Sequence, residues 1–203
     1  MFTGIVQGTA IVKSIDQKKD LSRLGIEFPA SSLEKVAHGA SIAINGTCLT
    51  VSEYTDTIVY FDVMIETLRV TNLSQLEIGS LVNFERAAKF GDEIGGHLLS
   101  GHIHTTVVVS SVEKTENNCI IKFKVPEEWI KYILEKGFVA VNGCSLTVGE
   151  VTEDEFNVYL IPETLSITTF GSTRPGAIIN LEVDHQTQTI VDTVERLGLK
   201  ITQ

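Results

Sequence analysis

The densest group of reactive side chains is the stretch Gly95–His104, which contains His97, His102 and His104. Histidine transfers protons near neutral pH and binds metal ions. The three histidines lack the i, i+4 spacing of a helical zinc site, and no thiolate or carboxylate ligand pattern accompanies them, so we expect no metal. His102 and His104 alternate with Ile103, so both would face the same way on a strand. On the residues alone, the alternative to a functional site is a structural role, in which these histidines cap turns or line a domain boundary.

A second group of polar side chains occurs twice, each time after an Asn-Gly pair. Each copy offers a thiol or hydroxyl, a threonine two residues later, and a Glu-Thr pair further on. The members are Cys48, Thr50, Glu66 and Thr67 in the first copy and Ser145, Thr147, Glu163 and Thr164 in the second. These groups form hydrogen bonds without a fixed positive charge, which suits a neutral polyhydroxylated or heteroaromatic ligand. The alternative is that they only satisfy the backbone of turns.

The sequence lacks the motifs of two large enzyme classes. Gly91, Gly95, Gly96 and Gly101 form neither G-x-G-x-x-G nor a phosphate-binding P-loop. Ser145 lacks the second glycine of the G-x-S-x-G motif of hydrolases. Nucleoside triphosphate chemistry and serine hydrolysis of that type are therefore not indicated.

Both groups belong to an internal repeat with a constant spacing of 97 residues. Asn45–Val51 recurs as Asn142–Val148, and Glu66–Leu68 recurs as Glu163–Leu165. No insertion or deletion interrupts the register. The sequence therefore predicts two domains of one fold, residues 1–86 and residues 97–185.

Within each copy, short runs of β-branched and aromatic residues between turn residues predict about six strands. In the first copy these runs are Ala10–Val12, Ile42–Ile44, Leu49–Val51, Ile58–Phe61 and Leu81–Phe84. One short helical stretch is expected per copy, near Ser31–Val36 and near Glu127–Leu134. Closure would protect the strand edges, so we predict a mainly β fold with a small barrel in each copy. The Asn-Gly turn would bring its thiol or hydroxyl and its threonine to one face of the next strand.

Two segments lie outside the repeats. Arg86–Gly96 is rich in Gly, Lys and Asp and is interpreted as a linker. In the last segment, residues 186–203, apolar residues recur at helical steps: Ile190, Val194, Leu197 and Ile201. Because a closed barrel has little room for this seam, we expect an oligomerisation helix. Packing against the chain's own barrel is the alternative.

Composition and charge limit the range of partners. Sixteen Lys and Arg against 26 Asp and Glu give a net charge of −10 over 203 residues, which opposes binding to phosphate backbones, so no nucleic-acid partner is expected. No apolar run approaches the ~18 to 20 residues of a membrane span, and no secretory signal is recognised, so no membrane partner is expected. Three cysteines without C-x-x-C spacing fit reduced thiols in a cytoplasm.

Several motifs together resemble the riboflavin synthase family of the alpha-chain type, a tandem-barrel family that includes the lumazine proteins. They are Met1–Val6, Asn45–Val51, Gly95–His102, Asn142–Val148 and Ile161–Leu165. The resemblance spans nearly the whole chain. It implies two tandem six-stranded Greek-key barrels and a homotrimer held by C-terminal helices. Active sites would lie between the first barrel of one chain and the second barrel of another.

The reaction implied by the resemblance is a dismutation, the last step of riboflavin biosynthesis. Two molecules of 6,7-dimethyl-8-ribityllumazine exchange a four-carbon unit and yield riboflavin and 5-amino-6-ribitylamino-uracil, with no cofactor or metal. The C7 methyl group of the donor loses a proton and attacks the acceptor. Holding the two rings face to face can supply up to ~7 to 11 kcal/mol of the barrier reduction.

The resemblance also implies the site residues. His102 is expected as a proton shuttle, Ser145 as an activator, and Asp184 as the partner that orients Ser145, while Thr147 and Cys48 complete the catalytic candidates. The substrate-binding candidates in the first copy are Gly4, Ile5, Val6, Cys48, Leu49, Thr50, Asp62, Val63, Met64, Ile65, Glu66 and Thr67. Those in the second copy are Gly101, His102, Ile103, Lys136, Ser145, Leu146, Thr147, Ile161, Pro162, Glu163, Thr164, Leu165 and Ser166.

The main alternative is a non-catalytic carrier of lumazine or flavin, because the lumazine proteins share this fold. The presence of Gly96-His97, Gly101-His102 and Ser145–Thr147 favours the enzyme. A pair of barrels with a purely structural role would leave the duplicated polar groups without a purpose.

Overall fold

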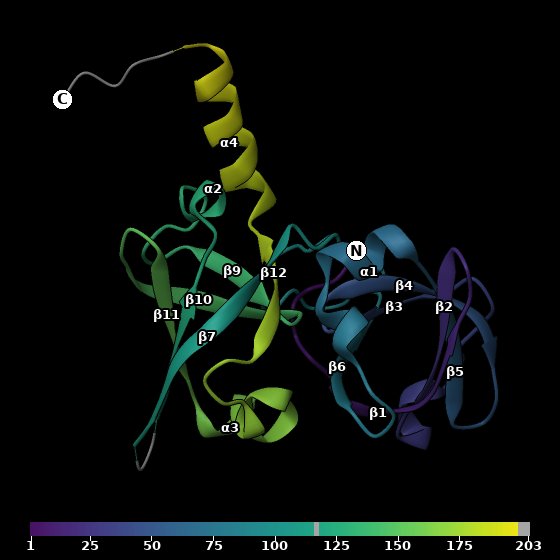
Figure 1. Ribbon diagram of the computed structural model, residues 1–203. Coiled ribbons are helices and arrows are strands. Elements are labelled where there is room, and N and C mark those ends of the chain that lie inside the picture. Colours follow the sequence, from purple (N-terminus) through teal and green to yellow (C-terminus); the bar gives the residue numbers. More distant parts are fainter. Residues whose placement is uncertain (116–117, 199–203) are drawn as a thin grey trace.

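The structure is a computed structural model that describes residues 1–115 and 118–198. Within these residues, two closed antiparallel barrels lie side by side, and the C-terminal helix α4 (His185–Arg196) projects away from them (Figure 1). This confirms the predicted mainly β fold with one barrel per repeat.

The first barrel consists of β1 (Gly8–Gln17), β2 (Leu21–Glu27), β3 (Ser41–Ile44), β4 (Thr47–Tyr54), β5 (Ile58–Met64) and β6 (Leu81–Arg86). The order round the barrel is β1-β2-β5-β4-β3-β6. Three consecutive strands, β3 to β5, are neighbours, and β2 lies beside the last of them. This is the Greek-key arrangement that the family resemblance implies.

The second barrel repeats this arrangement. Its strands are β7 (Thr105–Lys114), β8 (Cys119–Lys124), β9 (Phe138–Val141), β10 (Cys144–Val151), β11 (Glu155–Leu160) and β12 (Ile178–Val183). The first and last residues of β4 and β10, and those of β6 and β12, differ by the same 97 residues as the sequence motifs. The internal repeat is therefore a repeat of structure.

The short helical segments differ in part from expectation. The 3₁₀ helix η1 (Ala30–Leu33) and the helix α2 (Glu127–Ile130) lie where one helical stretch per copy was predicted. Each copy also has a helix and a 3₁₀ turn between its fifth and sixth strands, which were not predicted. These are α1 (Ile65–Val70) and η2 (Asn72–Gln75), and α3 (Pro162–Ile167) and η3 (Thr169–Ser172). Arg86, expected to begin the linker, is instead the last residue of β6.

Each barrel has its own hydrophobic core. Phe61 and Phe84 are fully buried in the first, and Phe123 and Phe156 in the second. Burial of a phenylalanine side chain is worth about 1.5 to 3 kcal/mol, so these residues are main contributors to barrel stability. Val6 crosses over: it precedes the first barrel in the chain but packs in the core of the second.

The two barrels meet through reciprocal contacts. Asn45 and Gly46 have φ values of 45° and 80°, and their counterparts in the second Asn-Gly turn have nearly the same values, as a tight hairpin turn of type I′ requires. A Cβ on Gly46 would lie 2.7 Å from the backbone nitrogen of Gly143, so only glycine fits here. The Asn83 side chain donates to the Asn142 carbonyl at 3.0 Å, and the equivalent bond from Asn180 to Asn45 measures 2.9 Å. This pairing of equivalent contacts indicates an approximate twofold axis.

The segments that precede the barrels cross at this axis. The backbone groups of Phe2 and Leu99 exchange two hydrogen bonds of 2.9 Å. Beyond them, Gly4 accepts a hydrogen bond from the Ser145 backbone N–H, and Gly101 accepts one from that of Cys48, both at 2.8 Å. Each segment thus reaches the opposite barrel, a feature that the division into residues 1–86 and 97–185 does not capture.

Candidate functional site

The two repeated thiol or hydroxyl groups lie on equivalent outer faces. Cys48 and Thr50 lie on the outward side of β4, while the intervening Leu49 is buried in the core. Ser145 and Thr147 occupy the same places on β10. The period-two alternation of a strand therefore places these side chains as the sequence predicted.

Each of these strands leaves an open edge at its beginning. β4 pairs with β5 from Val51 to Tyr54, and β10 pairs with β11 from Val148 to Val151. The residues before Val51 and Val148 therefore have a free side, which the crossing segment of the opposite copy occupies through Gly101 or Gly4. The crossing segment of each copy therefore contacts the strand that carries the thiol or hydroxyl group of the other copy.

These contacts, together with the predicted binding segments at the ends of β5 and β11, define two candidate half-sites. The first half-site contains Cys48–Thr50, Asp62–Thr67 and Gly101–Ile103, and the second half-site contains Ser145–Thr147, Ile161–Ser166 and Gly4–Val6. Each combines residues of both repeats. The sequence proposed all of these segments, but it did not reveal that each half-site takes its glycine segment from the other copy.

Each half-site has an exposed apolar surface beside its polar groups. Met64 at the end of β5 is 56% exposed, and its counterpart Ile161 before α3 is 61% exposed. Such side chains suit the face of a flat heteroaromatic ring, and the thiol, hydroxyl and carboxylate groups suit its polar edge. Both half-sites are open surfaces in the single chain.

Some predicted site residues cannot present their side chains to a ligand. Val6, Leu49 and Val63 are buried in the barrel cores, so they can contribute only backbone groups.

Lys136 is exposed, with a φ of 65°, and its backbone N–H donates to Val148 at 3.0 Å. The Glu66 carboxylate forms an exposed ion pair of 2.8 Å with Arg69, one turn along α1.

A close contact between two side chains in the second half-site involves a residue outside the predicted set, His97. Its Nδ1 atom lies 2.7 Å from the Ser145 Oγ. The ring stacks on Phe138, with centroids 5.3 Å apart, and its buried Nε2 has no hydrogen-bond partner among the described residues. The histidine-rich stretch was recognised in the sequence, but only the fold brings His97 to β10.

Burial keeps the His97 imidazole neutral at neutral pH. Burial lowers the pKa of the imidazole, and the carboxylate of Asp184 opposes this shift without cancelling it. A neutral ring with its proton on Nε2 can accept the Ser145 hydroxyl proton at Nδ1. The pair can therefore make the Ser145 Oγ a better hydrogen-bond acceptor or a proton relay.

Asp184 has a different partner from the one expected. It caps the N-terminus of α4, where its carboxylate accepts bonds from the Thr187 backbone N–H at 2.8 Å and the Thr187 hydroxyl at 2.7 Å. Burial alone would raise the pKa of this carboxyl, but these hydrogen bonds outweigh it and hold the pKa below its usual value. The residue that contacts Ser145 is His97, so the expected Asp184–Ser145 pair is not formed in this structure.

The other two histidines have different surroundings. His104 accepts a bond from the Val183 N–H at 3.2 Å and contacts Gln188 at 3.1 Å. Its ring packs at a tilt against Trp129, with centroids 5.1 Å apart, so it joins β12, α4 and α2. This is the structural role that the sequence left open. His102 is exposed, and its backbone N–H donates to the Ser100 hydroxyl at 3.0 Å.

A pair of equivalent cavities lies beside the crossing segments. The one next to the second barrel has a volume of about 670 Å³ and is lined in part by His97, His102 and Asp184. Its counterpart next to the first barrel, about 700 Å³, has Ile5 and Ala87 at the positions of His102 and Asp184. The twin cavities have thus diverged: charged groups line both, while histidines line the one next to the second barrel.

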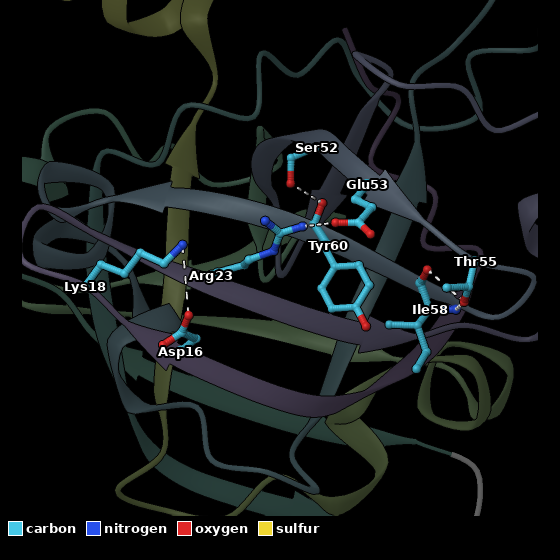
Figure 2. Close-up of polar contacts among 8 residues, drawn as sticks. All are labelled: Asp16, Lys18, Arg23, Ser52, Glu53, Thr55, Ile58 and Tyr60. Carbon is cyan, nitrogen blue, oxygen red and sulfur yellow. Dashed lines mark hydrogen bonds and ion pairs between the residues drawn. The ribbon is translucent and has the colours of Figure 1, made fainter.

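The outer faces of the barrels have diverged as well. Figure 2 shows Arg23 on β2 reaching Glu53 on β4. The Arg23 guanidinium also lies over the ring of Tyr60, 5.1 Å from its centroid. Arg23 is also directly opposite Asp62 in the β2–β5 ladder. The second copy has Ile120 at the position of Arg23, so this charge network borders the first half-site alone.

Two kinds of feature are absent from the part of the chain that the structure describes. In residues 1–115 and 118–198, no group of three or more His, Cys, Asp and Glu side chains is arranged to hold a metal ion. In the same ranges, no helix has the length and apolar character needed to cross a membrane.

Comparison with known proteins agrees with this geometry. The model of the lumazine binding domain family matches twice, at residues 3–87 and 100–184. The riboflavin synthase of Escherichia coli K12 is 56% identical over 198 residues, which are 97% of this chain and 93% of that protein. The chain belongs to the riboflavin synthase family. Both family repeats begin at the crossing segments, with Thr3 and Ser100.

Solved structures of LumP have the same fold. The crystal structure of LumP complexed with riboflavin has a TM-score of 0.86 at 32% identity, and the one complexed with 6,7-dimethyl-8-(1'-D-ribityl) lumazine has 0.83 at 31%. Each alignment covers 91% of this chain and 100% of the LumP chain. Riboflavin synthase family members and LumP thus share the tandem barrels, so the fold alone does not separate catalysis from binding.

Proposed function

We propose that this protein is an enzyme that converts two molecules of 6,7-dimethyl-8-ribityllumazine into riboflavin and 5-amino-6-ribitylamino-uracil. A four-carbon unit passes from one lumazine to the other, so atoms balance without an added cofactor. The reaction needs two places for the same compound, one for the donor and one for the acceptor. The observation that carries the proposal is the pair of equivalent half-sites on one chain.

The protein's groups would act mainly by alignment and proton transfer. The apolar surfaces of Met64 and Ile161 would hold the two rings, and alignment of two reactants is worth up to ~7 to 11 kcal/mol. The His97–Ser145 pair would polarise or relay a proton at the second half-site, for a contribution of about 10² to 10⁴-fold. His102, exposed on the crossing segment at the first half-site, is the candidate for moving the C7 methyl proton.

Both half-sites have exposed apolar side chains in the single chain, and the family resemblance implies sites between chains, so we propose that the active centre forms between chains of a homotrimer. α4 supports this assembly. It is fixed to its own barrel on one side, where Tyr132 donates to Asp192 at 2.6 Å. On its other side Ile190 and Leu197 are 64% and 67% exposed, which leaves an apolar seam for a second chain. Ile201, the last residue of the predicted seam, lies outside the described residues.

A reducing compartment such as the cytoplasm is proposed for this protein because all three cysteines are free thiols. Cys119 and Cys144 are buried in the barrels, and Cys48 is half-buried at the first half-site. An oxidised Cys48 would obstruct the first half-site.

The test is to mix the purified protein with 6,7-dimethyl-8-ribityllumazine alone and to follow riboflavin fluorescence. Catalytic turnover, many riboflavin molecules formed per chain, is the expected result. The matched variant Ser145→Ala should lower kcat more than it weakens lumazine binding, because the His97–Ser145 contact would act on the reaction.

A non-catalytic carrier of lumazine or flavin is the second candidate. The observation that favours it is the similarity of this fold to that of LumP complexed with riboflavin. A carrier would bind the lumazine tightly and form no riboflavin. That outcome would reject the enzymatic proposal and retain the ligand-binding half-sites.

A further inference from the structure

We propose that two buried glutamates, Glu85 and Glu182, are crossed positioning residues: each belongs to one barrel and fixes the half-site on the other. Glu85 on β6 would position the second half-site, and Glu182 on β12 would position the first. This inference rests on the assignment of the half-sites under the proposed function.

Glu85 binds the first crossing segment with both carboxylate oxygens. One oxygen accepts bonds from the Thr3 backbone N–H at 2.6 Å and the Thr3 hydroxyl at 2.8 Å. The other accepts from the Gly4 N–H at 3.0 Å. The residue itself is 4% exposed, so its carboxylate is committed to this segment.

Glu182 repeats the arrangement on the second crossing segment. One oxygen accepts from the Ser100 backbone N–H at 2.7 Å and from the Ser100 hydroxyl at 2.8 Å, and the other accepts from the Gly101 N–H at 3.1 Å. The Ser100 hydroxyl in turn accepts from the backbone N–H of His102. Glu182 therefore also holds the segment that carries the exposed histidine.

A single glycine connects each carboxylate to the opposite barrel. Gly4 donates to Glu85 and accepts from the Ser145 backbone N–H at 2.8 Å. Gly101 links Glu182 to Cys48 in the same way. Both glycines have positive φ values. A Cβ on Gly4 would lie 2.5 Å from the Cβ of Ser145 on β10, and a Cβ on Gly101 would lie 2.6 Å from the Cβ of Cys48 on β4. Because one glycine makes both contacts in a closely packed position, a shift of the Glu85 or Glu182 carboxylate would displace Ser145 or Cys48.

The ionised carboxylates fit these surroundings. Burial raises the pKa of both carboxyl groups, while the three donors around each one oppose that shift. Every neighbouring group described above is an N–H or O–H donor. A glutamine at either position would point an NH₂ group at one of these donors and lose at least one of the three bonds.

The test measures how fast one thiol at each half-site is alkylated by iodoacetamide. In the natural chain that thiol is Cys48, because Cys119 and Cys144 are buried and burial raises the pKa of Cys144 to about 12. The double variant Cys48→Ser/Ser145→Cys places the reactive thiol at the second half-site instead. Glu85→Gln and Glu182→Gln are then introduced into both backgrounds.

Crossed effects are expected. Glu182→Gln should speed alkylation of Cys48 by about tenfold and leave the thiol at position 145 unchanged, because loss of a hydrogen bond to a charged group favours local opening by about 1.5 kcal/mol or more. Glu85→Gln should speed alkylation at position 145 and leave Cys48 unchanged. Thr3→Ala and Ser100→Ala, which remove one hydroxyl donor each, should give the same pattern at about threefold if a glutamine variant does not fold.

Two outcomes would overturn the proposal. Equal acceleration of both thiols in either variant would indicate general loosening of the barrels, and acceleration within the same barrel would indicate that the glutamates act locally. A second measurement, protection of the thiol by added 6,7-dimethyl-8-ribityllumazine, separates this proposal from the proposed function. Crossed alkylation without ligand protection would retain the crossed geometry and reject the half-sites as lumazine sites.

Discussion

At the scale of single residues, the second half-site depends on the contact between His97 Nδ1 and Ser145 Oγ, which measures 2.7 Å. Ser145 was predicted from the repeat and its family resemblance, and it lies where expected. Its partner His97 could not be assigned, since it precedes the repeated segment and has no counterpart in the first copy. Hydrogen bonds between distant residues depend on how the segments cross, which periodicity and spacing do not reveal.

The His97–Ser145 contact gives a direct mutational prediction. His97→Ala should reduce kcat by about tenfold or more, because it removes a proton acceptor that touches Ser145. His97→Asn can place an amide oxygen near the position of Nδ1 and should retain more activity. The comparison of kcat and KM for the two variants checks this, and equal losses would argue against a proton-accepting role.

The pKa of His97 predicts a pH dependence. Burial lowers this pKa below 6.5, so the native state favours the neutral ring and the unfolded chain binds the proton first. The associated stability is present above pH 6.5 and is lost as the pH falls toward the native pKa of His97. Urea unfolding between pH 5 and pH 8 should show this loss, and His97→Asn should reduce it. NMR titration of the imidazole with a midpoint above 6.5 would refute the prediction.

At the scale of elements, the strands and the helical segments η1 and α2 were predictable, whereas α1 and α3 were not. The strands follow from β-branched runs bounded by turn residues, and the Asn-Gly turns appear where the sequence placed them. α1 and α3 are each a six-residue helix with no buried residue, so they show no apolar periodicity. Each forms in the connection between the fifth and sixth strands of its barrel, so its position depends on the barrel around it.

The contact between the Asn-Gly turns predicts a matched pair of variants. Gly143→Ala would bring a Cβ within 2.8 Å of Gly46, whereas Gly176→Ala has nothing within 4 Å although both glycines have positive φ. Strain at positive φ costs about 1 kcal/mol in each variant, and the clash adds to it only at position 143. Urea unfolding should therefore show a larger loss for Gly143→Ala. Equal losses would mean that the barrels do not depend on this close approach.

At the scale of the whole molecule, the duplication was readable from the sequence but the exchange of segments was not. A spacing of 97 residues indicates two copies, and it holds in the structure strand by strand. It gives no information on whether Gly4 and Gly101 contact their own barrel or the opposite one. The exchange makes each half-site a product of both repeats, so neither barrel carries a complete half-site by itself.

The exposed seam of α4 predicts the behaviour of the assembly. Ile190→Asp and Leu197→Asp together should lower the sedimentation mass from that of the proposed homotrimer toward that of a monomer, because they place two charges in the proposed apolar contact. Thr189→Asp, on an exposed neighbouring position of the same helix, is the matched control and should leave the mass unchanged. A trimer that persists in the double variant would assign the assembly to another surface.

The most direct test of the account is the stoichiometry of the reaction with 6,7-dimethyl-8-ribityllumazine as the only reactant. Consumption of lumazine and formation of riboflavin and 5-amino-6-ribitylamino-uracil can be measured in the same samples by chromatography. Two bound lumazines that exchange four carbons predict two molecules consumed for each riboflavin and each pyrimidine formed. A one-to-one conversion to riboflavin, or a requirement for a separate four-carbon donor, would contradict it.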